Sequence, residues 1–312
     1  MPLGRTLSLN AAVAALGVAA TLAVPASAGA AKVAGCPLLP RTVPTNLRVD
    51  HLPVLQGSDA IVASLGLDEG LHADFGSGLY EGRPIGIPYD VVSRRTARER
   101  VRFGYAGESD KVRYPIPRGV HIEGGRNADG DRHALLLDRS ACRHYELFDL
   151  QGRPGAWTAG SGATWNLRSN RVRPAGWTSA DAAGLPILPL LARHGEAKRG
   201  RIDHALRVTV RRSRRAYVYP ARHFASSDPD PSLPRMGERL RLKAGVDVSG
   251  LPRQARVIAK ALKRYGLIVA DNGSDWYVSG APSPGWDNDQ LRTLRGLTGR
   301  DFEVVDTRPL RR

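Results

Sequence analysis

The sequence contains only two cysteines, Cys36 and Cys142, among 312 residues. They lie far apart and neither belongs to a CxxC spacing, which excludes the common zinc-binding and redox motifs. In an exported chain, two distant cysteines of this kind are expected to form one disulfide. We therefore predict a Cys36–Cys142 bond that contributes roughly 2–4 kcal/mol to stability. Two buried free thiols are the alternative.

Long hydrophobic runs are also absent, apart from one near the N-terminus. Arg5 is followed by the apolar residues 11–24 and then by the small residues at 26–28. A positive start, a short apolar centre and a small-residue exit are typical of a secretory signal peptide. The run is too short to span a membrane comfortably. We predict that residues 1–28 are a signal peptide, that the mature protein is secreted into the extracellular space, and that it has no membrane span.

Familiar catalytic motifs are missing as well. There is no GxSxG elbow, because Gly160-Ser161-Gly162 lacks the rest of the motif, and there is no GxxxxGK[ST] phosphate loop. No HExxH motif or Cys/His cluster has zinc spacing. These absences argue against a serine hydrolase of the common type, a nucleotide-dependent enzyme and a zinc peptidase. No cofactor and no metal are predicted.

Negative charge is scarce, since 46 Lys and Arg face 30 Asp and Glu and give a net charge of +16. A basic exported protein is attracted to polyanions. The basic residues are scattered, and the one dense cluster, at 211–215, is expected to be a solvated turn. This scatter argues against a nucleic-acid surface. It favours a polysaccharide or an anionic cell-wall polymer as the partner, and it leaves the oligomeric state open.

The 34 glycines and 22 prolines favour many turns and short strands over long helices. Strands are expected at 85–92, 100–105, 133–139, 142–150, 163–167, 202–210, 216–220, 239–243 and 267–271. Helices are expected only at 58–65, 252–266 and 287–297. Because the strands do not alternate with helices, we predict a mainly β fold. It is a single antiparallel β-sandwich, jelly-roll or concanavalin-like, with a few peripheral helices.

The sandwich domain is expected to span residues 58–312, after an extended N-terminal arm at 29–57. The prolines at 37, 40, 44 and 53 keep that arm extended. Near the other end, Asn272-Gly273 separates LIVAD from WYVSG, and this dipeptide predicts a tight hairpin between the two strands.

Four sequence blocks suggest a wider relationship. The chain contains GWTSADAAGLPILP, IDHALR, YPARHFASS and ADNGSDWYVSGAP in this order. With these blocks it resembles a group of uncharacterised secreted actinobacterial proteins over nearly its whole mature length. The resemblance implies secretion and assigns no catalytic residues.

Carboxylates are the most promising chemistry in an exported β protein. Hydrolysis of a glycosidic bond needs one carboxylic acid to protonate the leaving oxygen and one carboxylate to attack or to activate water. Glu123, in HIEGG, is the preferred catalytic candidate because its glycine neighbours let a polymer approach closely. Asp181, in TSADAAG, is a second candidate, although its position after two hydroxyl residues also suits a helix N-terminus.

His204 is the third catalytic candidate. In a strand over 202–210 it lies on the same face as an apolar row, where it is either a core residue or a general acid/base with a tuned pKa. In a lyase, His or Tyr removes a proton beside a uronate while Arg neutralises the carboxylate. Arg222 and His223, together with Tyr219, would suit that alternative and are predicted to bind substrate.

Trp157, Trp177 and Trp276 are the aromatic candidates for stacking on sugar rings, with the sandwich core as the competing place for each. Together these patterns predict a secreted carbohydrate-active enzyme, either a glycoside hydrolase that uses a carboxylate pair or a polysaccharide lyase. A non-catalytic protein that binds cell wall or glycan is the alternative function.

Overall fold

The computed structural model describes Met1 and residues 31–310. Apart from Met1, the signal peptide predicted at 1–28 therefore lies outside the described residues. Strands account for 26% of the chain and helices for 16%. The predicted mainly β class is confirmed.

The helices are short, and only one exceeds two turns. The α-helices are α1 (Ser58–Ser64), α2 (His194–Arg199), α3 (Arg253–Arg264) and α4 (Asn288–Arg292). The 3-10 helices are η1 (Pro44–Asn46), η2 (Leu188–Leu190), η3 (Thr293–Gly296), η4 (Gly299–Asp301) and η5 (Arg308–Leu310).

The strands are also short and contain two to six residues each. They are β1 (Lys32–Val33), β2 (Cys36–Pro37), β3 (His72–Asp74), β4 (Leu79–Tyr80), β5 (Arg83–Pro84), β6 (Tyr89–Val92), β7 (Val101–Phe103), β8 (Ala134–Asp138), β9 (Arg143–Phe148), β10 (Gln151–Arg153), β11 (Ala156–Ala159), β12 (Ser161–Asn166), β13 (Leu206–Val210), β14 (Arg239–Leu242), β15 (Leu267–Asn272), β16 (Tyr277–Ser279) and β17 (Phe302–Val304).

The largest sheet has six strands in the order β17-β14-β15-β13-β16-β3. Helix α1 contacts β17 and α3 contacts β14, and their apolar side chains share one core with the sheet. Helix α3 begins after Pro252 and buries Ile258 and Leu262 on the stripe that the sequence predicts. It ends before Gly266, whose φ is +70° and where a Cβ atom would lie 2.3 Å from the carbonyl oxygen of Leu240.

The second sheet has four strands in the order β12-β9-β8-β6, next to a three-stranded sheet of order β10-β11-β7. Strand β8 is buried throughout because both of its faces are covered, and four of its five residues are apolar. Leu136 packs in a cluster with Trp157 of the three-stranded sheet. Leu135 and Leu137 point to the opposite face and pack in a cluster with Ile187 and the N-terminal arm.

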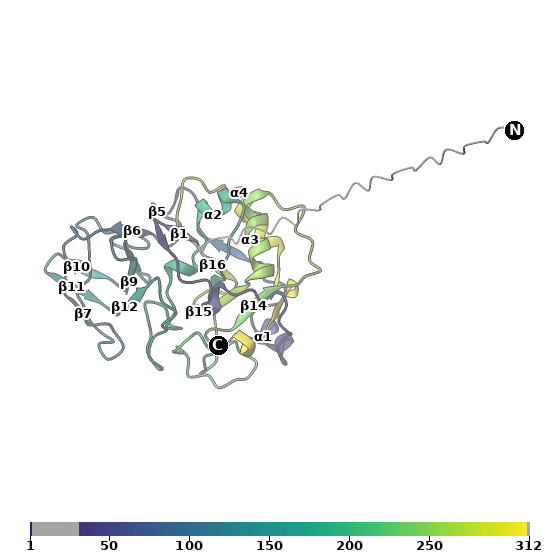
Figure 1. The fold of residues 1–312 in the computed structure, drawn as a ribbon. Coiled ribbons are helices and arrows are strands. Elements are labelled where there is room, and N and C mark those ends of the chain that lie inside the picture. Colours follow the sequence, from purple (N-terminus) through teal and green to yellow (C-terminus); the bar gives the residue numbers. More distant parts are fainter. Residues whose placement is uncertain (2–30, 311–312) are drawn as a thin grey trace.

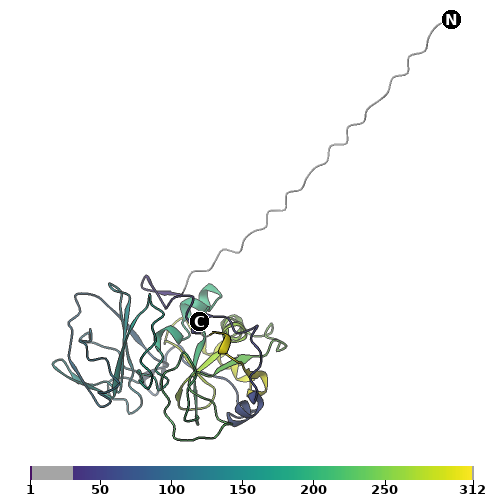
Figure 2. The same ribbon diagram turned by 60° about the horizontal axis from the view of Figure 1, so that its bottom comes forward.

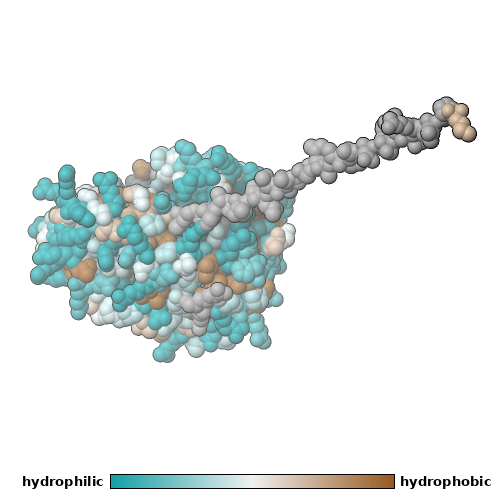
Figure 3. All heavy atoms as spheres, viewed as in Figure 1, coloured by the Kyte–Doolittle hydropathy of each residue, from teal (hydrophilic) through white to brown (hydrophobic). Residues whose placement is uncertain are grey.

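These sheets divide the molecule into two lobes that lie side by side (Figure 1). One lobe holds strands β6 to β12, and the other holds the helices and strands β13 to β17. A turned view shows the same separation (Figure 2). The face shown in Figure 3 is largely hydrophilic, with hydrophobic side chains in small separate areas. This surface agrees with the high content of charged residues.

Residues 178–188 form a connecting segment that lies between the lobes. On one side, the buried carboxylate of Glu146 in β9 accepts hydrogen bonds from the backbone N–H groups of Ala180 and Ile187. On the other side, Asp181 forms an ion pair with Arg207 of β13. The segment therefore holds the four-stranded sheet against the six-stranded sheet through buried polar contacts.

Cys36 and Cys142 form a disulfide, with their Cα atoms 5.2 Å apart. The predicted pairing is confirmed. The bond fastens the N-terminal arm to the turn between β8 and β9.

The prediction of a single antiparallel sandwich is not confirmed. The strands are divided among five sheets, and β13–β15, β16–β3, β6–β8 and β11–β7 pair in parallel. Short strands with local turns were compatible with a sandwich, but strands far apart in sequence pair across connections that no local pattern reveals. The boundary of a single domain at 58–312 stays a prediction.

The hairpin predicted at Asn272-Gly273 is wrong, because β13 lies between β15 and β16. Gly273 does not have the positive φ that a type I′ turn needs, and its N–H donates to the carbonyl of Val210 at the end of β13. The chain thus passes over the end of β13 instead of folding back directly.

Two other predicted strands are altered. Strand β13 begins at Leu206, so His204 precedes it and does not belong to the apolar row. The strand expected at 216–220 is reduced to an isolated bridge between Tyr217 and Met236.

Reduction of the disulfide should lower the free energy of unfolding by about 2–4 kcal/mol, because the bond closes a loop with a sequence separation of 106. The measurement is urea denaturation with and without a reductant. A variant with both cysteines replaced by serine is the control and should show no response to the reductant. Equal stability of the oxidised and reduced protein would contradict the expectation.

Candidate functional site

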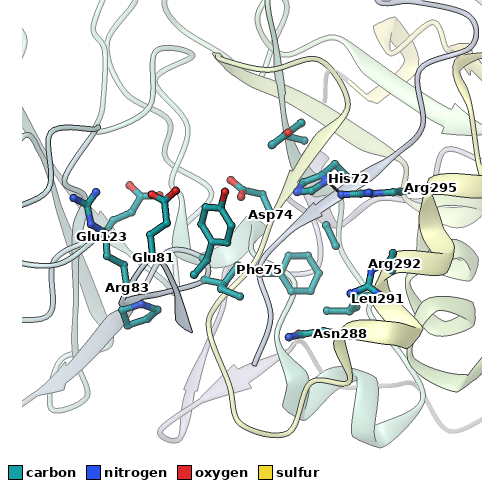
Figure 4. Close-up of a pocket in the computed structure, with 17 residues that line it drawn as sticks. His72, Asp74, Phe75, Glu81, Arg83, Glu123, Asn288, Leu291, Arg292 and Arg295 are labelled. Carbon is teal, nitrogen blue, oxygen red and sulfur yellow. Dashed lines mark hydrogen bonds between the residues drawn. The ribbon is translucent and has the colours of Figure 1, made fainter. Parts of the chain in front are cut away.

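An open cleft of about 800 Å³ lies at the β3 edge of the six-stranded sheet, facing the other lobe. Its volume is in the range of small-ligand and oligosaccharide sites. Figure 4 shows its side chains. They come from β3, the β4–β5 hairpin, the loop after β7, β16 and the α4–η3 region: His72, Ala73, Asp74, Phe75, Tyr80, Glu81, Arg83, Pro84, Ile85, Gly86, Glu123, Gly124, Tyr277, Asn288, Leu291, Arg292 and Arg295.

Strand β3 positions the centre of the cleft. It pairs in parallel with β16, so that His72 lies opposite Tyr277 and Asp74 lies opposite Ser279. The rings of His72 and Tyr277 stack with their centroids 4.1 Å apart. His72 and Asp74 are two residues apart and share one face of the strand. The edge of the sheet thus presents an aromatic pair and a carboxylate together.

Two glycines allow the chain to cross tightly below the cleft. A Cβ atom on Gly280 would lie 2.4 Å from the ring of Phe75, and one on Gly86 would lie 2.5 Å from the carbonyl oxygen of Gly280. Gly86 also has a φ of +112°, which disfavours other residues. These contacts fix where the β4–β5 hairpin leaves the sheet, and hence where its side chains meet the cleft.

Glu123 enters the cleft from the other lobe and is held by a buried histidine. Oε2 of Glu123 lies 2.5 Å from Nδ1 of His133, and Nε2 of His133 lies 3.0 Å from the carbonyl oxygen of Ala180. Since a carbonyl oxygen only accepts, Nε2 carries a proton, and Nδ1 donates to the carboxylate. Both ring nitrogens therefore donate, which describes a charged imidazolium.

The pKa values of this pair agree with that assignment. Burial alone would lower the pKa of His133, but the charge and hydrogen bond of Glu123 outweigh it and raise the pKa to about 9. Burial also opposes ionisation of Glu123, yet His133 lowers its pKa below the ordinary value, with a further contribution from Arg207. Glu123 is thus ionised at neutral pH, and Oε1 has no hydrogen-bond partner among the described residues.

Asp74 has the opposite character. Its side chain is exposed in the cleft, and partial desolvation by the surrounding walls raises its pKa. The negative charge of Glu123 raises the pKa further, while Arg207 lowers it in part. The cleft therefore holds two carboxyl groups whose pKa values move apart, which is the pattern of a general acid and an ionised partner.

Arg207 provides the positive charge beneath these groups. It is buried, binds Asp181 through Nε and Nη2 at 2.7–3.0 Å, and donates from Nη1 to the hydroxyl of Ser279 at 2.6 Å. Nη2 also lies 3.8 Å from Asp271. These carboxylates keep the pKa of Arg207 above its ordinary value, so the guanidinium is a permanent charge in the site.

Of the three predicted catalytic residues, only Glu123 lines the cleft. Asp181 is fully buried and its carboxylate is occupied by Arg207. His204 is 2% exposed, its Nε2 lies 2.7 Å from Arg193 and 3.3 Å from Glu196, and its Nδ1 lies 2.7 Å from a carbonyl oxygen. The structure therefore does not bring Asp181 or His204 into the cleft.

Trp177, Arg222 and His223 lie together, but outside the cleft lining. Trp177 stacks below the guanidinium of Arg173, whose carbonyl oxygen accepts from Nε of Arg222. Nδ1 of His223 lies 2.8 Å from the carbonyl oxygen of Ala182. The three predicted substrate-binding residues thus form one partly exposed group, and they do not share the cleft with Glu123. Among the described residues, His204 contacts Arg193 and Glu196 and does not belong to this group.

Trp157 and Trp276 occupy core positions. Trp157 is 2% exposed, and Trp276 is 1% exposed and donates from its indole N–H to the carbonyl of Leu65. Neither ring is available to stack on a sugar. Aromatic surface in the cleft comes instead from Tyr80 and Tyr277.

Neither Asp74 nor His133 is among the candidates selected from the sequence. Asp74 lies in a glycine-rich stretch that reads as a loop, because β3 has only three residues. His133 precedes an apolar strand and resembles a core residue. The glycine pair after Glu123 is a local signal for this loop, and it led to the selection of Glu123.

Within the described residues, no group of three or more His, Cys, Asp or Glu side chains is arranged to hold a metal ion. Nor does any described helix combine the length and apolar character needed to cross a bilayer. Comparison of the chain with protein-family models, with curated proteins and with solved structures finds no match.

Replacement of His133 by Gln should remove a pH-dependent part of the stability. The folded pKa of His133 is raised from 6.5 to about 9. Its contribution is therefore fully present below pH 6.5 and is lost as the pH rises through 9. We expect the parent protein to lose about 2 kcal/mol more than His133→Gln between these limits. Urea denaturation at both ends of this range measures the difference. His51→Gln, at an exposed site, is the control, and parallel pH curves for His133→Gln and the parent would contradict the assignment.

Replacement of Asp181 by Asn should destabilise the fold by about 3–5 kcal/mol, because it leaves the charge of Arg207 buried without its closest partner. Asp68→Asn breaks the exposed pair with Arg300 and should leave the stability nearly unchanged, because water screens that pair. Denaturant midpoints of the two variants provide the comparison. Equal, small effects would show that the Asp181 pair does not support the core.

Proposed function

We propose that the protein is a secreted glycoside hydrolase and that the cleft between the lobes is its active site. The observation that carries this proposal is the pair Asp74 and Glu123, two carboxyl groups that line one open cleft and have opposite pKa shifts. Glycosidic bonds are hydrolysed by such pairs. Tyr80 is 69% exposed at the cleft and offers a ring face on which a sugar can stack.

Each carboxyl group has a role that its environment suits. Asp74, with its raised pKa, donates a proton to the glycosidic oxygen as that bond breaks. Glu123 is ionised and weakly basic, which suits a nucleophile better than a general base, and its Oε1 forms a bond to the anomeric carbon. Water then gives a proton to the Asp74 carboxylate and attacks the same carbon. This step releases Glu123 and leaves Asp74 protonated again.

His133 acts through Glu123 in this scheme and is a positioning residue. The hydrogen bond from Nδ1 orients the carboxylate, the hydrogen bond from Nε2 to the carbonyl of Ala180 fixes the ring, and the charge of the ring keeps the carboxylate ionised. In each of the two steps, the attacking group approaches the anomeric carbon from the face opposite the leaving group and inverts it. Two successive inversions retain the configuration in the proposed mechanism.

The sequence features support the same conclusion. The signal-peptide pattern at 1–28 indicates export, and the Cys36–Cys142 bond is compatible with an oxidising compartment. The resemblance to secreted actinobacterial proteins also favours an extracellular role. The net charge of +16 favours a polysaccharide or an anionic wall polymer as the partner.

A non-catalytic glycan-binding protein is the second candidate. The exposed pair Leu79 and Tyr80 on the β4–β5 hairpin favours it, because exposed aromatic groups at a cleft bind sugars without chemistry. Both candidate functions require that the protein binds a glycan, and only the hydrolase cleaves it.

The proposed acid and nucleophile can be tested by release of reducing sugars from a panel of polysaccharides. Glu123→Gln should abolish turnover, and Asp74→Asn should lower kcat by about 100- to 10,000-fold. Activity should fall above the raised pKa of Asp74 and below the lowered pKa of Glu123, which gives an acidic optimum. Asp59→Asn, an exposed carboxylate on α1, is the matched control and should keep full activity.

Full activity of both variants would overturn the site assignment. Binding of glycans by the parent protein without any turnover, in equal measure for Glu123→Gln, would favour the glycan-binding candidate.

A further inference from the structure

The cleft is electrically polarised along its length. The carboxylates of Glu123 and Glu81 lie on one side of Asp74, and Arg292 and Arg295 lie on the other (Figure 4). Arg83 also lies at the acidic end, where it faces Asp129 at 3.4 Å. The end formed by the α4–η3 region is therefore the basic end of the cleft.

Arg295 is the least neutralised cation in the cleft. No carboxylate lies within ion-pair distance of it among the described residues, and its contact is from Nη2 to Nδ1 of His72 at 3.3 Å. Arg292 faces Asp289 at 2.8 Å, but both side chains are more than 60% exposed, so this pair is weak. An anion at this end would meet a guanidinium that has no competing charge.

The backbone holds Arg295 in place beside the sheet. A Cβ atom on Gly70 would lie 2.3 Å from the carbonyl oxygen of Arg295, so η3 rests directly on the chain that leads into β3. The N–H of Leu71 donates to the carbonyl of Leu297 just beyond η3. Desolvation, and then the charge of Arg295, lower the pKa of His72, so this ring is a neutral acceptor at pH 7. The fold thus fixes the backbone from which the guanidinium extends into the cleft.

We propose that the basic end of the cleft binds an acidic group of the substrate, so that the protein acts on an anionic polysaccharide and not on a neutral one. This inference rests on the proposed function. The planar fork of a guanidinium matches a sugar carboxylate or a sulfate ester, which share the geometry of two or more oxygen acceptors. Glu123 and Glu81 repel an anion at the other end. An acidic sugar unit is therefore placed over Arg295, and the bond to be cleaved is placed next to Asp74 and Glu123.

The test measures binding and turnover separately. Oligosaccharides of galacturonate, of a sulfated galactan and of neutral glucan are titrated by calorimetry into Glu123→Gln, which is designed to bind without cleavage. Arg295→Ala in that background should weaken binding of an acidic oligosaccharide by about 10-fold or more and leave binding of the neutral one within about 2-fold. Arg295→Lys keeps the charge but loses the fork, and its affinity should lie between the two.

A matched control separates this effect from the overall charge of the protein. Arg212→Ala removes an arginine that is paired with Asp228, 63% exposed and outside the cleft. It should change the affinity for acidic oligosaccharides by less than about 2-fold. Thermal melts confirm that each variant is folded.

The outcomes distinguish the two proposals. Preference of the parent for galacturonate or for the sulfated polymer identifies the acidic group. Either preference supports the inference if Arg295→Ala abolishes that preference. Equal binding of neutral and acidic oligosaccharides, or equal losses in Arg295→Ala and Arg212→Ala, overturns it, even if the protein hydrolyses a neutral glycan. Binding of acidic oligosaccharide at Arg295 by a parent protein that cleaves nothing supports the anion site and refutes the hydrolase.

Discussion

The ion pair between Arg207 and Asp181 is the interaction on which the arrangement of the two lobes depends. Arg207 lies on a central strand of the six-stranded sheet, and Asp181 lies in the segment that crosses to the four-stranded sheet. Both side chains are buried, so neither charge can be satisfied by water if the other is displaced. Removal of either partner is therefore costly, because it leaves the other charge buried and uncompensated.

The same guanidinium links structure to chemistry. Its charge reaches the carboxyl groups on both walls of the cleft, and it lowers the pKa of Glu123 and of Asp74. His133 adds a second positive charge on the side of Glu123 alone. Desolvation dominates on the side of Asp74. One shared cation and one local cation are enough to separate the pKa values of two chemically similar carboxyl groups. The same separation occurs in enzymes whose acid and nucleophile are both carboxyl groups.

The elements that the sequence predicts well are those with a local signal. Helix α3 has an apolar stripe between a proline and a glycine, and β8 begins with four consecutive apolar residues and ends at a tight turn. The disulfide followed from chemistry, since only one pair was possible. Asn272-Gly273 misled because a turn dipeptide reports local backbone preference, while the insertion of β13 between two strands is a property of the whole sheet.

The cleft was predictable only in part. Glu123 was recognised through its glycine neighbours. Its partner His133 lies only 10 residues later in the sequence, whereas the carboxyl of Asp74 reaches the cleft through long-range strand pairing. Strand β3 joins β16 from about 200 residues away in sequence, and no periodicity marks a three-residue edge strand. The alternation of apolar residues predicts that His204 belongs to a strand over 202–210. The strand begins only at Leu206, so this pattern does not give the position of His204.

The position of the disulfide has one more consequence. The ring that it closes, from Cys36 to Cys142, contains Asp74, Glu81 and Glu123 of the cleft and the exposed β4–β5 hairpin. If a protease cuts the chain once at that hairpin, the two pieces remain covalently joined. A chain nicked at the border of its own cleft therefore keeps Asp74 and Glu123 within one covalently joined molecule.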